Sequence, residues 1–207
     1  MERTNAYSLL DFLDNSPCNF FATATIQRHL DDNGFHELKQ SERWNLEKGG
    51  KYYVKKNDTA IFGFVIGETP LDQSGFNMIS AHSDSPCFRI KPNPEMLADG
   101  VLKLNTEVYG GPILYTWFDR PLSLAGRVIV RNPQNPARPI TKLIDFASPV
   151  LIIPHLAIHF NRNVNAGNPL SKQKDMLPIA AIVSDSMSKN NFLIDQIKER
   201  LEIADSN

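Results

Sequence analysis

One stretch, residues 76–91 (FNMISAHSDSPCFRIK), most constrains how this chain can fold. An apolar run leads through small residues to His82 and Asp84, and the run ends at the Ser85-Pro86 pair. This order predicts a buried strand that delivers a histidine and an aspartate at its carboxyl end. Ligands of open α/β sheets bind just beyond that end of the strands, so the stretch predicts a functional site on a catalytic layer.

His82 is the first candidate for chemistry. An imidazole binds zinc through one ring nitrogen, and a nearby carboxylate can fix the other nitrogen or the ring orientation. This predicts His82 as a metal ligand and Asp84 as the catalytic residue that orients it. The alternative is a histidine that is simply hydrogen-bonded at the rim of the core, and spacing alone leaves both interpretations open.

Composition limits the classes of partner and compartment. The 22 basic and 23 acidic residues nearly cancel, which favours neither nucleic acid nor an anionic membrane as a partner. Two cysteines, Cys18 and Cys87, are too few for a disulfide framework. The first residues contain acids where a signal peptide is apolar, and no segment has the ~20 apolar residues of a membrane span. We therefore expect a soluble, cytoplasmic protein.

Two helices are predicted near the start. Residues 5–15 have helical apolar spacing, and a second helix is predicted with Ser16 as its cap and Pro17 at its first position. That helix should end at Asn33-Gly34.

Strand patterns follow the helices. Residues 51–55 and 59–66 are rich in β-forming side chains and flank a Lys-Asn-Asp turn, which predicts a hairpin. Helices followed by strands indicate part of an α/β (α+β) catalytic domain, incomplete as a layer.

The composition changes after the His82 stretch. Three prolines between residues 86 and 94 predict an extended connector and a domain boundary, giving domains of residues 1–91 and 92–207. The second domain is predicted to be antiparallel and β-rich, from strand patterns at residues 101–108, 113–118 and 122–131. The cluster at residues 117–120 (WFDR) is better explained as aromatic packing with an Asp–Arg pair at a turn than as a catalytic group.

The second informative stretch is residues 149–161 (PVLIIPHLAIHFN). Pro154 at a helix start would place His155 and His159 on one helical face, a spacing that could bind metal. The glutamate of the zinc-helix motif HExxH is missing between them. A final amphipathic helix is predicted to open at Ser188.

Several segments resemble one family, the M18 zinc aminopeptidases related to aspartyl aminopeptidase. The motif AHSDSPCFRIK resembles the family's first active-site segment, and four further stretches match in the family's order. These stretches are residues 51–67 (KYYVKKNDTAIFGFVIG), 107–111 (EVYGG), 116–130 (TWFDRPLSLAGRVIV) and 153–165 (IPHLAIHFNRNVN).

The resemblance implies a zinc-peptidase-like catalytic domain, partial here, with an inserted β-rich dimerisation domain. It implies two zinc ions per complete site, with His82 as a ligand. His155 is a candidate for a second metal-associated histidine, and packing at the helix start is the better explanation for it. His159 would contact substrate in a neighbouring subunit of a homo-oligomer built from dimers.

The resemblance also implies that this chain is only about the N-terminal half of such an enzyme. The remaining carboxylate and histidine ligands and the general base lie downstream in the family. Since a catalytic zinc takes about three protein ligands, we expect the chain alone to be inactive.

Three functions stay open at this point. The first is the N-terminal portion of an aminopeptidase that removes N-terminal residues, acidic ones included, from peptides. The second is a non-catalytic oligomerisation module from a truncated gene. Nucleophilic hydrolysis through Ser83, Ser85 or Cys87 is weaker, because no Gly-x-Ser-x-Gly elbow surrounds them.

Overall fold

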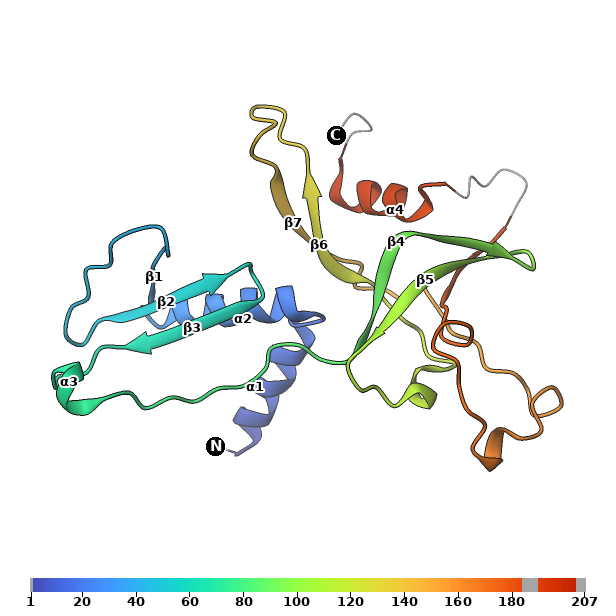
Figure 1. Ribbon diagram of the computed structural model, residues 1–207, viewed down its shortest axis with the longest axis horizontal. Helices are drawn as coiled ribbons and strands as arrows, with labels where there is room; N and C mark the ends of the chain where they lie inside the picture. Colours follow the sequence, from blue (N-terminus) through green and yellow to red (C-terminus); the bar gives the residue numbers. More distant parts are fainter. Residues whose placement is uncertain (1, 184–189, 204–207) are drawn as a thin grey trace. The chain divides into compact units, whose positions relative to one another are not determined.

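A computed structural model describes residues 2–183 and 190–203 of the 207-residue chain. The fold mixes helices and strands (Figure 1). Contacts divide the chain into two compact units, Met1–Ser85 and Pro86–Asn207. The sequence predicted a boundary at residues 91 and 92; the assignment of the two parts as catalytic and dimerisation domains stays a prediction.

The first unit opens with the two expected helices, α1 (Glu2–Asp14) and α2 (Asn19–Asp32). The predicted end of α2 is confirmed: Gly34 has φ +77° and its amide donates to the carbonyl oxygen of Asp31. The predicted cap is wrong, because Cys18 and not Ser16 holds the N-cap position. Thr25 Oγ1 donates to the Asn15 carbonyl at 3.0 Å, so the residues before Cys18 form the corner between the helices.

A small sheet packs against α2. Its order is β1 (His36–Glu37), β2 (Lys51–Lys56) and β3 (Ala60–Val65), and β2 and β3 form the predicted antiparallel hairpin. The hairpin loop consists of Asn57, Asp58 and Thr59. Asn57 and Asp58 both have positive φ, and the Thr59 amide closes the turn by donating to the Lys56 carbonyl oxygen at 3.1 Å. The Tyr53 hydroxyl, which points toward α2, donates to Asp31 Oδ1 at 2.9 Å.

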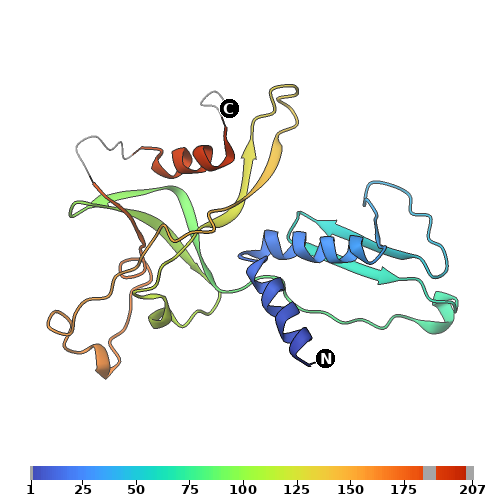
Figure 2. The same ribbon diagram turned by 180° about the vertical axis from the view of Figure 1, so that it is seen from behind.

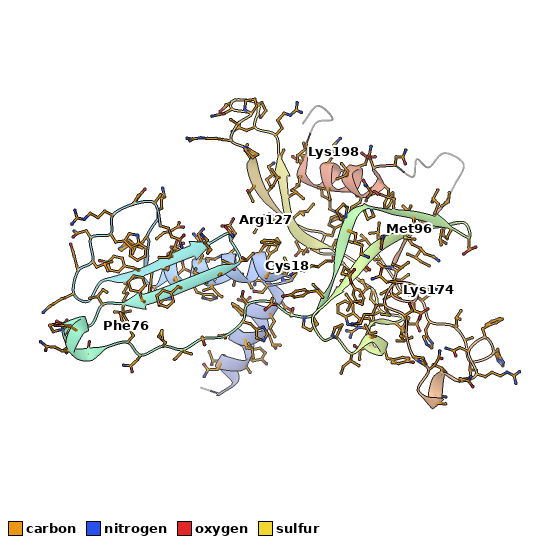
Figure 3. All side chains as sticks on the ribbon, viewed as in Figure 1. Cys18, Phe76, Met96, Arg127, Lys174 and Lys198 are labelled. Carbon is orange, nitrogen blue, oxygen red and sulfur yellow. The ribbon has the colours of Figure 1, made fainter. Side chains whose placement is uncertain are left out.

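The predicted strand before His82 is not formed in this chain. After the short helix α3 (Leu71–Ser74), residues 75–86 have no regular structure, and Figure 3 labels Phe76 at the start of this irregular trace. The side chains of Phe76, Met78 and Ile79 are 72%, 77% and 103% exposed. A strand needs hydrogen-bonded neighbours, and within the described residues no strand pairs with this segment.

The second unit contains a three-stranded antiparallel sheet of β4 (Cys87–Ala98), β5 (Val101–Tyr109) and β8 (Ile179–Ile182), with β5 in the middle. The proline-rich segment is extended, as predicted, but it is an edge strand and no connector. Proline cannot donate to a ladder, and the register of β4 shifts between Ile90 and Glu95, around the two prolines.

A separate hairpin of β6 (Ala125–Val130) and β7 (Ile140–Asp145) completes the strands. Its pairings and those of the larger sheet are antiparallel, in agreement with the predicted β-rich second half. The core of this unit is formed by side chains from strands and loops alike: Leu102, Leu104, Ile144, Phe146, Leu151, Ile153 and Met176 are buried.

Two predicted elements of the second unit are corrected. Residues 113–118 do not form a strand; they contain the 3-10 helix η1 (Leu114–Trp117). Residues 154–161 do not form a helix; they begin a long irregular loop, orange in Figures 1 and 2, in which the next regular turn is η2 (Val164–Ala166).

The last helix, α4 (Phe192–Leu201), contacts β4 and β7. Its predicted start at Ser188 lies outside the described residues. Within the described parts of the chain, no helix has the length and apolar character needed to cross a bilayer.

Candidate functional site

His82 and Asp84 lie together, as their spacing predicted. His82 Nδ1 is 2.7 Å from the backbone oxygen of Asp84 and 3.2 Å from its Oδ1. A carbonyl oxygen only accepts hydrogen bonds, so in the neutral ring Nδ1 carries the proton and Nε2 carries the lone pair. The side chain of His82 is 82% exposed. The arrangement therefore offers Nε2 to a ligand outside the segment.

A local contact holds this pair near the hairpin. Ser83 Oγ donates to the backbone oxygen of Thr59 at 3.0 Å, and Thr59 directly follows the Asn57-Asp58 turn. The carboxylate and the carbonyl of Asp84 thus orient the imidazole, while the hydroxyl of Ser83 attaches the segment to the hairpin loop before β3. Ser83 uses its proton in this structural bond, which argues against it as a nucleophile.

The described residues contain part of a zinc site and not a complete one. A catalytic zinc takes about three protein ligands, and among the described residues no group of three or more histidine, cysteine or acidic side chains could hold a metal ion. His82 supplies one suitable donor and Asp84 orients it. The residues present therefore fit part of a zinc site and do not hold the ion by themselves.

His155 and His159 lie in the second unit on the loop that replaces the predicted helix. They do not share a helical face, because Pro154, His155 and Leu156 have no helical hydrogen bonds. The ring of His155 lies 4.7 Å from the ring of Phe118, centroid to centroid. His159 is exposed in a turn.

The prediction of His155 as a metal ligand stays untested, although its ring contacts favour the packing alternative. An open cavity of about 350 Å³ lies beside this ring. Apolar and polar side chains both line the cavity, with Lys103, Lys174 and Asp175 among the polar ones. Its residues all come from the second unit.

A polar cluster that sequence analysis missed ties the far end of the same loop to the sheet. Lys91 Nζ lies 3.1 Å from Glu107 Oε2 and donates to Gln173 Oε1 at 2.9 Å, and Gln173 Nε2 lies 3.2 Å from Glu107 Oε2. The hydrogen bonds from Lys91 and then from Gln173 lower the pKa of Glu107 below its usual value. The motif EVYGG drew attention to Glu107, but its partners are too distant in sequence to be found by pattern.

Comparison with known proteins identifies the family. The family described as aminopeptidase I zinc metalloprotease (M18) matches residues 12–206, nearly the whole chain. The chain belongs to the M18 aminopeptidase family. It is 52% identical over 199 residues to a probable M18 family aminopeptidase 2 of Clostridium novyi, and the match covers 96% of this chain but 46% of that protein.

Solved structures support the M18 fold. The chain matches a structure of the Ape4 and Nbr1 complex with a TM-score of 0.88 and 32% identity, covering 95% of this chain and 39% of that one. An M18 aminopeptidase from Thermotoga maritima shares the fold with a TM-score of 0.76 at 24% identity, covering 99% and 45% of the two chains. The chain thus spans about half the length of the M18 relatives it matches.

Proposed function

We propose that this chain is the N-terminal portion of a zinc-dependent aminopeptidase that removes N-terminal residues from peptides. The observation that carries the proposal is the His82–Asp84 pair, an exposed imidazole held through Nδ1, inside a segment covered by the M18 match. Acidic N-terminal residues are the substrate class to test first. A zinc ion in such a site polarises the scissile carbonyl and activates water.

The chain's own residues have distinct roles in this proposal. His82 provides Nε2 as a zinc ligand, and Asp84 fixes the ring through Nδ1. His159, exposed on the loop of the second unit, contacts the substrate bound in a neighbouring subunit. For His155, a place next to the metal is the weaker alternative to its packing against Phe118.

The chain by itself is proposed to be inactive. The single donor of the His82 segment needs further ligands, and the M18 relatives are about twice as long as the matched region. We place the missing ligands and the general base in the remainder of the protein. A cytoplasmic location is also part of this proposal and rests on the low number of cysteines.

The two units have different roles in this proposal. Unit Met1–Ser85 belongs to the catalytic domain, and the antiparallel strands of the second unit belong to an inserted dimerisation domain. The expectation of a homo-oligomer draws support from one structural relative, the mApe1 dodecamer of S. cerevisiae. The alternative, a non-catalytic oligomerisation module, predicts assembly without zinc or activity.

Zinc content and peptidase turnover test the proposal. They are measured for this chain and for a longer protein that continues through the region present in the M18 relatives, with Asp-, Glu- and Leu-anilides as substrates. We expect zinc and turnover in the longer protein and neither in the chain alone. Replacement of His82 by Ala should remove most of the bound zinc, because it removes a direct ligand.

His36→Ala is the matched control, since His36 is an exposed histidine of the same unit on β1. It should leave zinc and turnover unchanged. Normal zinc content in the His82→Ala protein would contradict the ligand assignment, and a longer protein that assembles without turnover would favour the oligomerisation module.

A further inference from the structure

The loop that carries His159 starts at two hydrogen bonds made by one residue. The amide of Asp119 donates to the carbonyl oxygen of Ile153 at 2.9 Å, and Asp119 Oδ1 accepts from the backbone N–H of His155 at 2.9 Å. The two bonds fix the chain on either side of Pro154, which has no N–H of its own. Asp119 therefore sets the direction in which the chain runs from Ile153 toward His159.

The backbone of Asp119 explains why an aspartate serves here. Its φ is +53°, in the left-handed region, which outside glycine is adopted most readily by Asn and Asp. Asparagine could satisfy both the backbone and the acceptor role. Glycine could adopt the backbone conformation but has no side-chain acceptor. Comparing the two substitutions therefore separates the contribution of the backbone conformation from that of the hydrogen bond to His155.

The residues just before Asp119 contact the loop at both ends, at His155 and at Asn168. The ring of Phe118 packs on the ring of His155, and the hydroxyl of Tyr115 donates to the carbonyl oxygen of Asn168. Trp117 packs edge-to-face on Phe88 of β4, with 4.6 Å between ring centroids. The turn at residues 115–119 thus joins the sheet to both ends of the segment 155–168.

We propose that Asp119 is a positioning residue for His159. It holds the start of the loop so that the exposed imidazole four residues after His155 is presented in one place. This inference rests on the proposed function, in which His159 contacts substrate. Asp119 itself is bonded to backbone, so its effect on the reaction passes through the loop.

Hydrogen–deuterium exchange of the 207-residue chain tests the structural half of this inference. In Asp119→Gly the amides of residues 155–168 should exchange roughly tenfold faster or more, because a bond to a carboxylate is lost. Asp119→Asn should restore the slow exchange. Asp99→Gly is the matched control, since Asp99 is another aspartate with positive φ, in the turn between β4 and β5.

Turnover of the longer protein tests the functional half. Asp119→Gly should lower kcat about 10- to 100-fold by misplacing the histidine, and Asp119→Asn should recover most of it. In a His159→Ala background Asp119→Gly should lower kcat no further. Equal losses in both backgrounds, or unchanged exchange in Asp119→Gly, would overturn the inference, whereas a longer protein without any turnover would overturn the proposed function itself.

Discussion

At the scale of single residues, Tyr53 has the clearest change in ionisation. Its side chain is buried on β2, and its hydroxyl donates to the carboxylate of Asp31 on α2. Burial, together with the hydrogen bond to Asp31, raises the pKa of Tyr53 to about 12. The folded protein therefore holds this proton more tightly than the unfolded chain, whose tyrosines titrate near 10.

We predict a specific pH dependence of stability from this tyrosine. The stabilisation from its raised pKa is fully present below pH ~10 and is lost as the pH rises from about 10 to about 12. Tyr53→Phe should lower the unfolding free energy at pH 8 by about 0.5–1.5 kcal/mol, and the difference from the unsubstituted chain should shrink toward pH 12. Urea unfolding monitored by circular dichroism measures both.

Tyr7→Phe is the control for this titration, because Tyr7 is an exposed tyrosine of the same unit. Its effect on the unfolding free energy should be small at every pH. A Tyr53→Phe difference that stays constant between pH 8 and pH 12 would contradict the link between the hydrogen bond and the raised pKa.

Residue patterns identified which side chains to examine but not all of their roles. The spacing of His82 and Asp84 predicted their mutual contact, because residues two positions apart can touch without help from distant parts of the fold. The pattern at residues 117–120 could not reveal that Asp119 bonds to the loop, since its partner His155 is 36 positions away. Contacts of that range depend on how the strands between the two residues fold back.

At the scale of elements, α4 is anchored at both ends. Glu95 Oε1 of β4 accepts from the amide of Leu193 at 3.1 Å, in the first turn of the helix. In the last turn, Arg200 lies over the ring of Phe146 and donates to its carbonyl oxygen at 2.7 Å and to Ser148 Oγ at 3.0 Å. These anchors attach the helix to β4 and to the end of β7.

We predict that Arg200→Gln lowers the unfolding free energy of the chain by about 1–2 kcal/mol. The substitution removes both the forked donor and the cation over the ring. Arg28→Gln, at an exposed position of α2, has the same charge change and should alter the unfolding free energy by less than about 0.5 kcal/mol. Equal effects of the two substitutions in thermal or urea unfolding would contradict the anchoring role.

The elements that the sequence predicted correctly are those built from local contacts. The β2–β3 hairpin follows from β-rich runs around a turn at Asn57-Asp58, and the end of α2 follows from Gly34. The predicted histidine helix is wrong for a tertiary reason. Short helices depend on packing for stability, yet Leu156, Ile158 and Phe160 are all exposed, and Asp119 takes the first amide after Pro154.

At the scale of the whole molecule, the segment before His82 has the sequence of a buried strand and the exposure of a surface loop. Its apolar side chains are open to solvent in this chain. The chain spans about half of its M18 relatives, so we infer that the strand forms when the remainder of the protein supplies neighbours on both sides.

We predict that Ile79→Lys changes the unfolding free energy far less in this chain than in the longer protein. In this chain, where Ile79 is fully exposed, the unfolding free energy should change by less than about 0.5 kcal/mol. In the longer protein the same change should lower it by about 3 kcal/mol or more, because a charge would be buried in the sheet. Denaturant unfolding of both proteins gives the comparison, with Ile129→Lys, at an exposed position of β6, as control.

The sequence by itself determined the family, the mixed α/β composition, the first two helices, the first hairpin and the pairing of His82 with Asp84. These depend on side-chain chemistry and on neighbours a few positions apart. The tertiary structure decided that β4 is an edge strand, that residues 154–161 form a loop held by Asp119, and that residues 75–86 form no strand. Each of these outcomes depends on whether a distant part of the chain is present to satisfy backbone hydrogen bonds and cover apolar side chains.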